Sequence, residues 1–230
     1  LSTEFAGTLS ARGGDAGGDG GFIEISSRLT LSYSGSADLR APLGLWGTLL
    51  LDPADITINP GAGGESGLEA DLLANALTTG NVILDTTNVS ASDAGDITIN
   101  ADVDWAVDTT LTLLADNDII VNGDLTAALG SISLTATNDI ALNGAINVDD
   151  LFIAGNDITT GAGGTVDVNL FQLDSGNWSQ VASILPDFDA TNFRLGFSSS
   201  FLRATGGDGT VTAPYLLNDV FGLQGLNSDT

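Results

Sequence analysis

The sequence contains no Cys, Met, His or Lys, and its five cations, all Arg, stand against 30 acidic residues. Without Cys there are no disulfides and no thiolate metal sites. Without His or Cys there is no Ser–His or Cys–His nucleophile pair, and without Lys there is no Schiff base and no GxxxxGK[ST] phosphate loop. The composition therefore excludes most common catalytic centres, and we expect no catalysis.

The formal net charge of −25 is a poor match for polyanionic partners. Nucleic acid and anionic membranes bind through cations that replace counterions, so we expect neither partner. No apolar run approaches the roughly 18 residues of a membrane span, so we expect no membrane insertion. The chain also lacks an initiator Met and a signal-peptide pattern, so we expect it to be a segment of a longer protein.

Five short blocks that begin with Asp-Ile recur along the chain. They are DITIN (55–59), DITIN (96–100), DIIVN (118–122), DIALN (139–143) and DITTG (157–161). Their Ile residues are separated by 41, 22, 21 and 18 residues, and the first separation is about two periods. A period of roughly 20 residues is typical of one coil of a β-solenoid.

Each block alternates apolar and polar residues, as a strand with one buried face does. A second strand pattern precedes three of the blocks, at 111–115, 131–136 and 151–155, and short strand patterns fill the first fifty residues. Stacked coils would place Ile97, Ile119, Ile140 and Ile158 in one buried column of a parallel sheet. The sequence therefore predicts a parallel β-helix.

Two stretches depart from the strand pattern and predict short helices packed on the outside of the coils. The first, near 66–79, has the capping-box spacing of Ser66 and Glu69 and fills the double-length gap between the first two blocks. The second, near 178–185, places Trp178, Val181 and Leu185 on one face and ends before a proline. We expect β-helix coils over 1–170, and a continuation or cap of the same solenoid over 171–230.

The Asn-Asp pairs at the start of the blocks have two interpretations. Stacked Asp118, Asp139 and Asp157 would lie about 4.8 Å apart, where calcium could bridge their carboxylates. Asn and Asp also favour tight corners, where they accept backbone hydrogen bonds. Stacked Asn117, Asn138 and Asn156 would in that case form an amide ladder. We favour the structural corner, expect no required cofactor, and keep calcium as the alternative.

Two further patterns have an ordinary and a functional interpretation. The glycine-rich segment 13–21 resembles a calcium-binding nonapeptide but lacks the second Asp of that motif, so a glycine turn is favoured. Five aromatic side chains could stack on sugars, but scattered aromatics more often anchor a core. They are Tyr33, Trp46, Trp105, Trp178 and Tyr215.

Four phrases carry a resemblance to a known family. They are GGFIEISSRLTLSYSG (20–35), GTLLLDPADITI (47–58), LEADLLANALTTGNVILDTT (68–87) and GDITINADV (95–103). Over roughly 20–160 the chain resembles the filamentous haemagglutinin-like exoproteins of bacterial two-partner secretion. The resemblance implies a right-handed β-helix that is exported through an outer-membrane transporter and is secreted or displayed at the bacterial cell surface.

Three functions follow as hypotheses. The first is an adhesive shaft segment that attaches to host cells, other cells or biofilm matrix through a receptor, carbohydrate among the candidates. The second is the stem of an exoprotein whose activity, a contact-dependent toxin or iron-source binding, lies elsewhere. The third is a polysaccharide-active enzyme, either a glycosidase with paired carboxylates or a calcium-dependent lyase with Arg28 or Arg40 as its candidate base.

Overall fold

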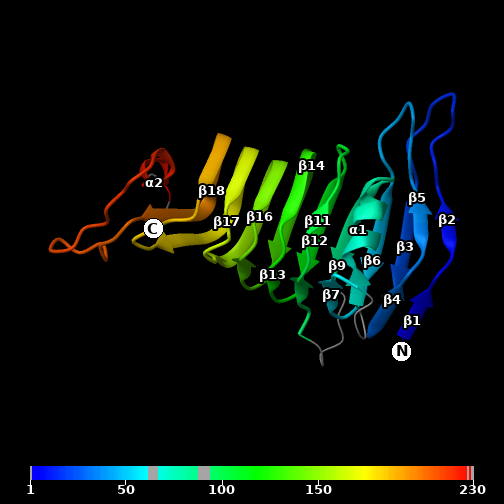
Figure 1. Ribbon diagram of the computed structural model, residues 1–230, viewed down its shortest axis with the longest axis horizontal. Helices are drawn as coiled ribbons and strands as arrows, with labels where there is room; N and C mark the ends of the chain where they lie inside the picture. Colours follow the sequence, from blue (N-terminus) through cyan, green and yellow to red (C-terminus); the bar gives the residue numbers. More distant parts are fainter. Residues whose placement is uncertain (1, 62–66, 88–93, 227, 229–230) are drawn as a thin grey trace.

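The computed structural model describes residues 2–61, 67–87, 94–226 and 228. It shows a β-solenoid of about eight turns, and the predicted parallel β-fold is confirmed. Figure 1 shows the turns stacked along the long axis, with the N-terminus at one end and the last turns of the chain at the other.

The described residues form eighteen strands and two helices. The strands of the first half are β1 (Ser2–Phe5), β2 (Thr8–Ser10), β3 (Phe22–Ser26), β4 (Thr30–Tyr33), β5 (Ser36–Asp38), β6 (Thr48–Asp52), β7 (Ile56–Asn59), β8 (Gly67–Glu69), β9 (Asn81–Asp85) and β10 (Ile97–Ile99). Those of the second half are β11 (Val103–Asp104), β12 (Thr110–Ala115), β13 (Ile119–Val121), β14 (Leu125–Ala136), β15 (Ile140–Leu142), β16 (Ile146–Thr160), β17 (Val166–Val181) and β18 (Phe188–Ala204). The helices are α1 (Ala70–Leu77) and α2 (Val220–Gly225).

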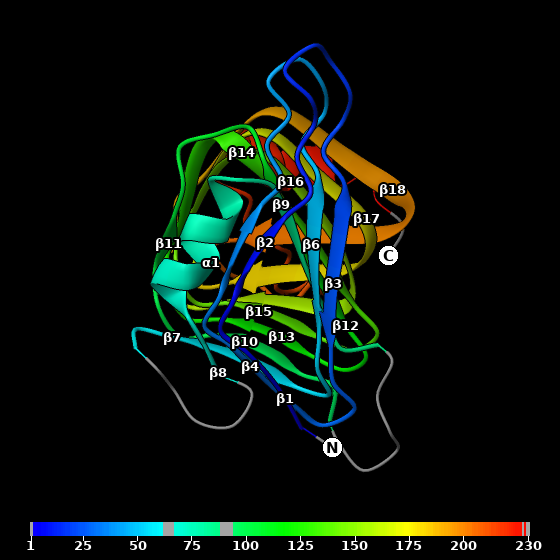
Figure 2. The same ribbon diagram turned by 90° about the vertical axis from the view of Figure 1, so that its right-hand side faces the viewer.

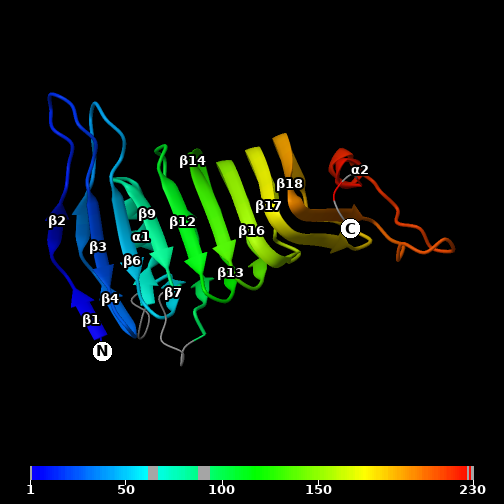
Figure 3. The same ribbon diagram turned by 180° about the vertical axis from the view of Figure 1, so that it is seen from behind.

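The coils have three walls, each a ladder of parallel strands. Wall A runs from β3 through β6, β9 and β12 into the last part of β14 and the middle parts of β16, β17 and β18, and Figure 3 shows these strands in that order. Wall B contains β8, β7, β10, β13 and β15 and the last parts of β16, β17 and β18. Wall C contains β11 and the first parts of β14, β16, β17 and β18. The long strands therefore run through the corners from one wall to the next.

The isoleucine column lies in wall B. Ile97 pairs with Ile119, Ile119 with Ile140, and Ile140 with Ile158, so each stands directly above the one before. All four side chains are almost completely buried. At about 25 cal/mol per Å² of apolar surface, complete burial of each contributes roughly 1.5–3 kcal/mol to the free energy of folding.

The corner after wall B brings neighbouring backbones too close for a side chain. A Cβ added at Gly144 would meet the Gly123 carbonyl oxygen at 2.1 Å, and one at Gly123 would meet the Ala101 carbonyl carbon at 2.2 Å. At the Asn122-Gly123 and Asn143-Gly144 steps the chain therefore turns where only glycine fits.

Helix α1 is part of the wall and is not laid over it. In wall C it packs between β5 and β11 (Figure 1), and its Leu73 and Leu77 side chains lie in the core. The Thr109 hydroxyl donates to the Leu77 carbonyl at 2.6 Å and so ties the helix to the next coil. The predicted helix is present but begins later, at Ala70, and Glu69 makes no side-chain cap bond. Ser66, the other half of the predicted capping box, lies outside the described residues.

The 41-residue gap between the first two blocks is not two stacked periods. Ile56 pairs directly with Ile97, so β7 and β10 are neighbours in wall B. After β7 the chain returns parallel to itself as β8 on the opposite side of β7, then forms α1 in wall C and β9 in wall A. This return, from Thr57 to the paired Gly67, accounts for ten of the additional residues.

The predicted helix near 178–185 is wrong. Trp178 and Val181 belong to β17, which pairs with β18 over this stretch, and Leu185 lies in the connection between the two strands. Trp178 is fully buried, whereas Val181 is 44% exposed, so the two side chains do not share a buried face. The alternating burial of a β-strand, and not the apolar spacing of a helix, therefore describes this segment.

The last turn is closed by an aromatic cluster and by α2. Phe171, Trp178, Phe188, Phe193, Phe201 and Phe221 form a network of ring contacts with centroid distances between 4.8 and 6.2 Å. Asp219 caps α2 by accepting from the Gly222 amide, and it also pairs with the buried Arg203 guanidinium. Among the described residues, neither helix is long and apolar enough to cross a bilayer.

Candidate functional site: the polar corner and the acidic groove

Each Asp that opens a wall B strand accepts hydrogen bonds from the following coil. Asp118 Oδ1 accepts from the Asn138 side-chain amide at 2.8 Å and from the Asp139 backbone amide at 3.0 Å. The next carboxylate, Asp139 Oδ1, receives the Asn156 amide at 3.4 Å and the Asp157 backbone amide at 3.1 Å. One carboxylate oxygen thus holds two donors of the neighbouring coil.

The same arrangement begins earlier and ends later in the column. Asp55 Oδ1 accepts from the backbone amides of Gly95 and Asp96 at 2.8 and 3.0 Å. Asp96 and Asp157 accept from Asn117 and Asn177. In every case the acceptor lies on the earlier coil and the donor on the later coil. We name this column of five carboxylates, Asp55, Asp96, Asp118, Asp139 and Asp157, the polar corner.

The amide ladder lies at a different place from the predicted one. The side-chain amides of Asn117, Asn138 and Asn156 donate to aspartates and not to one another, and only their backbones pair. The amides that do form a ladder belong to Asn59, Asn100, Asn122 and Asn143 at the opposite end of the same strands, with successive distances of 3.3, 2.9 and 2.8 Å. Their signal was in the sequence, because an Asn follows each Ile of the first four blocks by three residues.

The calcium candidates Asp118, Asp139 and Asp157 are stacked in register by the strands that follow them. Asp118 and Asp139 each use Oδ1 for two hydrogen bonds and Asp157 uses it for one, so the polar corner has a structural role without a metal. Within the described ranges, no three carboxylates converge on one point in the manner of a metal site. Their chemistry as arranged is to bind the next coil.

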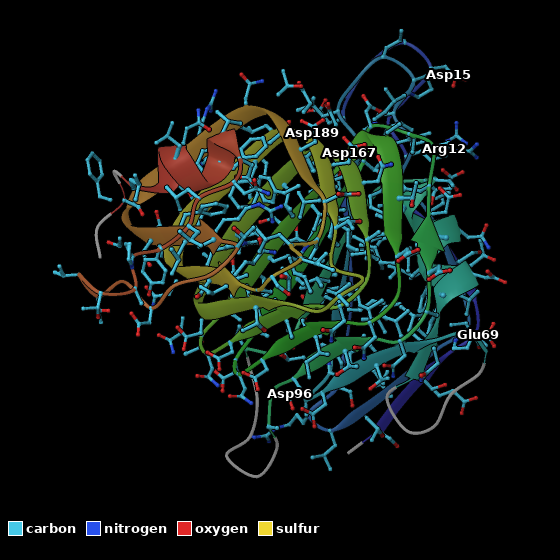
Figure 4. The ribbon with its side chains drawn as sticks, turned by 60° about the vertical axis from the view of Figure 1, so that its left-hand side comes forward. Arg12, Asp15, Glu69, Asp96, Asp167 and Asp189 are labelled. Carbon is cyan, nitrogen blue, oxygen red and sulfur yellow. The ribbon has the colours of Figure 1, made fainter. Side chains whose placement is uncertain are left out.

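Wall C carries an acidic groove near the C-terminal end. The groove has a volume of about 640 Å³, and its acidic lining residues are Asp167, Asp187 and Asp189. Asp167 and Asp189 occupy paired positions on β17 and β18, and Figure 4 shows them on neighbouring strands of the same face. Like charges at paired positions repel each other, so this groove is an electronegative concave surface.

Two loops at the other end form a projecting flap, which we define as residues 11–21 and 40–47. The loops are tied together by bonds such as Gly13 N–H to the Arg40 carbonyl at 3.1 Å, and Figure 2 shows them extending beyond the coils. At the base of the flap, hydrogen bonds from the Arg40 and Arg12 guanidinium groups hold the pKa of Asp38 well below its usual range.

The glycine-rich segment 13–21 belongs to the flap. Gly17 and Gly18 have φ values of 124° and 104°, which favour glycine. Asp19 Oδ1 accepts from the Leu45 amide at 2.9 Å and so joins the two loops. The segment therefore has the geometry of a glycine turn with an Asp tie.

Most of the aromatic side chains proposed as sugar platforms lie in the core. Trp105 and Trp178 are buried, as is Tyr33, and they present no face to solvent. Trp46 is half-buried and donates from Nε1 to Asp108 at 2.8 Å. Only Tyr215, which is 39% exposed, has the accessibility that stacking on a sugar requires among these five.

The two arginines of the enzyme hypothesis are not brought beside its stacked carboxylates. Strands β8, β7 and β10 lie between β4 and β13 in wall B. Arg28 precedes β4 and Asp118 precedes β13, so several strand spacings separate them. Arg40 is held by Asp38 at the base of the flap.

Comparison with models of known protein families, with curated proteins and with solved structures finds no match.

Proposed function

We propose that this chain is a shaft segment of a secreted bacterial surface exoprotein and that it presents adhesive surfaces to host cells, other cells or biofilm matrix. The observation that carries the proposal is the continuity of the stacking. Wall A runs from β3 to β18, walls B and C run from β8 and from β11 to β18, and the polar corner repeats the same interaction between coils. A stack of this kind transmits its shape along one axis, as an elongated display scaffold requires.

Two features support a location outside the cell. The outer surface is strongly acidic, which keeps such a rod soluble and separate from its copies. The absence of Cys suits a chain that crosses an outer-membrane transporter unfolded, because no disulfide can form beforehand. The phrases shared with filamentous haemagglutinin-like exoproteins support the same route of export and the same adhesive role.

The experiment measures adhesion directly. The purified chain is coupled to beads at a fixed surface density, and the beads are counted on epithelial cells, on bacterial cells and on extracted biofilm matrix. Adhesion to at least one surface, blocked by excess soluble chain, is the expected result. The matched control is Ile140→Asp, which places a charge in the isoleucine column and should abolish adhesion together with the fold.

The stem of a larger exoprotein is the competing function, and the same experiment separates the two. A folded, rod-shaped chain that coats the beads but adheres to none of the three surfaces contradicts the adhesive role. Scattering in solution should then still show an elongated particle, as a stem requires.

A further inference from the structure

The chain after β18 folds back over the outer edge of that strand, and we name this segment, residues 205–226 with Ser228, the lid. Strand β18 pairs with β17 on one side, and Figure 1 shows α2 beside it at the C-terminal end of the stack. The Phe201 amide donates to Ser228 Oγ at 2.9 Å, and the Thr205 amide donates to the Leu216 carbonyl at 2.7 Å. The lid therefore occupies backbone groups that a further strand would otherwise take.

Two glycines allow α2 to lie directly on this edge. A Cβ added at Gly225 would meet the Phe201 carbonyl oxygen at 2.2 Å, and one at Gly222 would meet the Arg203 carbonyl oxygen at 2.5 Å. Phe221, which precedes Gly222, packs its ring against the aromatic cluster of the last turn. The lid thus covers both the strand edge and the end of the apolar core.

Helix α2 cannot hold this position by itself. It has six residues, far fewer than the roughly 12–15 that an isolated helix needs in water. Its outer side is open to solvent, with Val220 57%, Leu223 61% and Leu226 63% exposed. The closed position of the lid therefore depends on its contacts with the last coil.

One inward-facing column of wall B becomes polar towards this end of the stack. Its residues are apolar and buried as far as Leu142, which pairs with Thr160. In the next coils Gln180 Nε2 donates to Thr160 Oγ1 at 2.5 Å, and Gln180 pairs with Arg203. The column ends in a guanidinium group, so the core of the last coil contains a positive charge.

Asp219 of the lid supplies the opposite charge. Arg203 is only 4% exposed, and its Nε donates to Asp219 Oδ2 at 2.5 Å. Its other two nitrogens donate to the Gln180 side chain and to the Pro186 carbonyl. Asp219 also accepts from the Gly222 amide at the start of α2, at 2.8 Å. Because a buried charge without its partner is strongly destabilising, this ion pair fastens the lid to the core, and we name it the latch.

We propose that the lid, fastened by the latch, prevents the last coil from pairing with a second copy of this chain. Pairing of parallel strands is the contact that builds the whole stack, so an uncovered β18 edge offers a strand of another copy the same kind of contact. Opening the lid also uncovers the aromatic cluster, which adds apolar surface to that contact. The interaction surface is the outer edge of β18, and its occupant is a strand of a second copy.

The test opens the latch in the purified chain. Asp219→Asn removes the charge but keeps a helix-capping acceptor, since Asn caps helices as well as Asp does. Hydrogen exchange at residues 220–226 should become about tenfold faster or more, while exchange in β12 should stay within about twofold of wild type. At about 0.3 M salt, which screens the repulsion between copies, the variant should form larger species than wild type at equal concentration. Size-exclusion chromatography with light scattering measures them.

Two further variants separate the latch from other effects. Asp208→Asn is the matched control, because the Asp208 carboxylate lies in the lid but bonds to Thr210 and not to Arg203. Its lid exchange and its particle size should equal those of wild type. Arg203→Gln combined with Asp219→Asn removes both charges and keeps a donor, so lid exchange should return to within about threefold of wild type.

Gly225→Ala opens the lid by a different route, because its Cβ would meet the Phe201 carbonyl oxygen while the latch stays intact. It should produce the same larger species as Asp219→Asn. The proposal is overturned by an Asp219→Asn variant whose lid stays closed, or by opened lids in both variants without larger species. Association that leaves the Phe201 amide unprotected overturns it as well, because pairing at the β18 edge must protect that amide.

Discussion

Removing the Asp118 carboxylate should weaken the contact between two coils by an amount that can be worked out from its bonds. Asp118→Ala deletes the acceptor for the Asn138 amide at 2.8 Å and for the Asp139 backbone amide at 3.0 Å. Hydrogen bonds to a charged group contribute about 1.5–3 kcal/mol each. Because Asp118 is half-exposed, water replaces part of the two lost hydrogen bonds, and we take about half of their summed contribution.

Removing the Asp118 charge also relieves its repulsion by the neighbouring carboxylates, which raises the stability of the variant. Asp118 lies between Asp96 and Asp139 at a strand spacing of about 4.8 Å, and two charges at that distance in water repel by about 0.9 kcal/mol before screening by salt. With two neighbouring carboxylates and screening by salt, the relief is roughly 1 kcal/mol in total, so the net loss is about 0.5–2 kcal/mol of unfolding free energy. For a chain of this size, 1 kcal/mol corresponds to about 2–4 °C, so Tm should fall by roughly 1–8 °C.

Two substitutions distinguish the hydrogen bonds from other effects. Asp118→Asn keeps an oxygen acceptor and removes the charge, so its stability should lie within about 1 kcal/mol of wild type. Asp116→Ala removes an exposed carboxylate that makes no side-chain hydrogen bond to another described residue, and it should be close to neutral. Asn138→Ala should cost about 1 kcal/mol, and its combination with Asp118→Ala should cost less than the sum.

The assay is thermal unfolding followed by circular dichroism, with and without a calcium chelator. The chelator should leave Tm of the wild-type chain unchanged within about 1 °C. The reasoning is refuted if Asp118→Ala matches Asp116→Ala. A large fall in Tm on chelation, together with an Asp118→Asn variant as unstable as Asp118→Ala, would favour the calcium interpretation.

Three further predictions concern the core, the corner and the flap. Ile140→Asp should abolish the cooperative thermal unfolding of the β-sheet, because it places a charge in a fully buried column. Ala141→Asp, on the outer face of the same strand, should fold. A folded Ile140→Asp variant would contradict the burial of the isoleucine column. Gly144→Ala should lower Tm by several degrees, because its Cβ would meet the Gly123 carbonyl oxygen at 2.1 Å. Gly61→Ala, with open space around the added Cβ, should leave Tm unchanged. Equal melting temperatures for the two variants would contradict the close approach of the Gly144 and Gly123 backbones. The pKa of Asp38 is lowered in the folded chain, so its ionised carboxylate stabilises the flap at pH values above the unfolded pKa of about 3.9. This stabilisation is lost as pH falls below about 3.9 towards the folded pKa. Amide protection of residues 11–21 should therefore decrease from about pH 5 to about pH 2 in wild type but not in Asp38→Asn.

Much of the fold could be predicted because the sequence repeat places similar residues at equivalent positions of neighbouring coils. The Asp-Ile blocks gave the coil length and the buried column, since a period-2 strand and a 20-residue period together specify which side chains stack. The helix near 178–185 was wrong because Trp178 also fits that period, twenty residues after Ile158, with which it pairs. The repeat is the stronger signal there, because pairing with the neighbouring coil stabilises the strand, whereas nothing in the fold stabilises a helix at that position.

Other features were not visible in the sequence for physical reasons. The return of the chain from β7 to β8 depends on which side of a strand the next one adds, and a hydrophobic pattern is the same for both sides. The helix-for-strand exchange at α1 creates a cavity beside Tyr33, and only the packing of wall C shows it. The partners of the polar corner lie on another coil, so their identity required the register between coils.

Because the chain has no Cys, a designed disulfide tests the stacking of coils most directly. Val121 and Leu142 are paired across neighbouring coils, and the side chains of the residues that follow them, Asn122 and Asn143, are hydrogen-bonded. The two backbones therefore lie about one strand spacing apart, within the Cα range of a disulfide. The double variant Asn122→Cys with Asn143→Cys should form an intramolecular disulfide on mild oxidation, detected by intact mass and peptide mapping. Asn100→Cys with Asn143→Cys, two coils apart, should stay reduced. Failure of the first pair to form a bond, or equal oxidation of both pairs, would contradict the register on which the whole account depends.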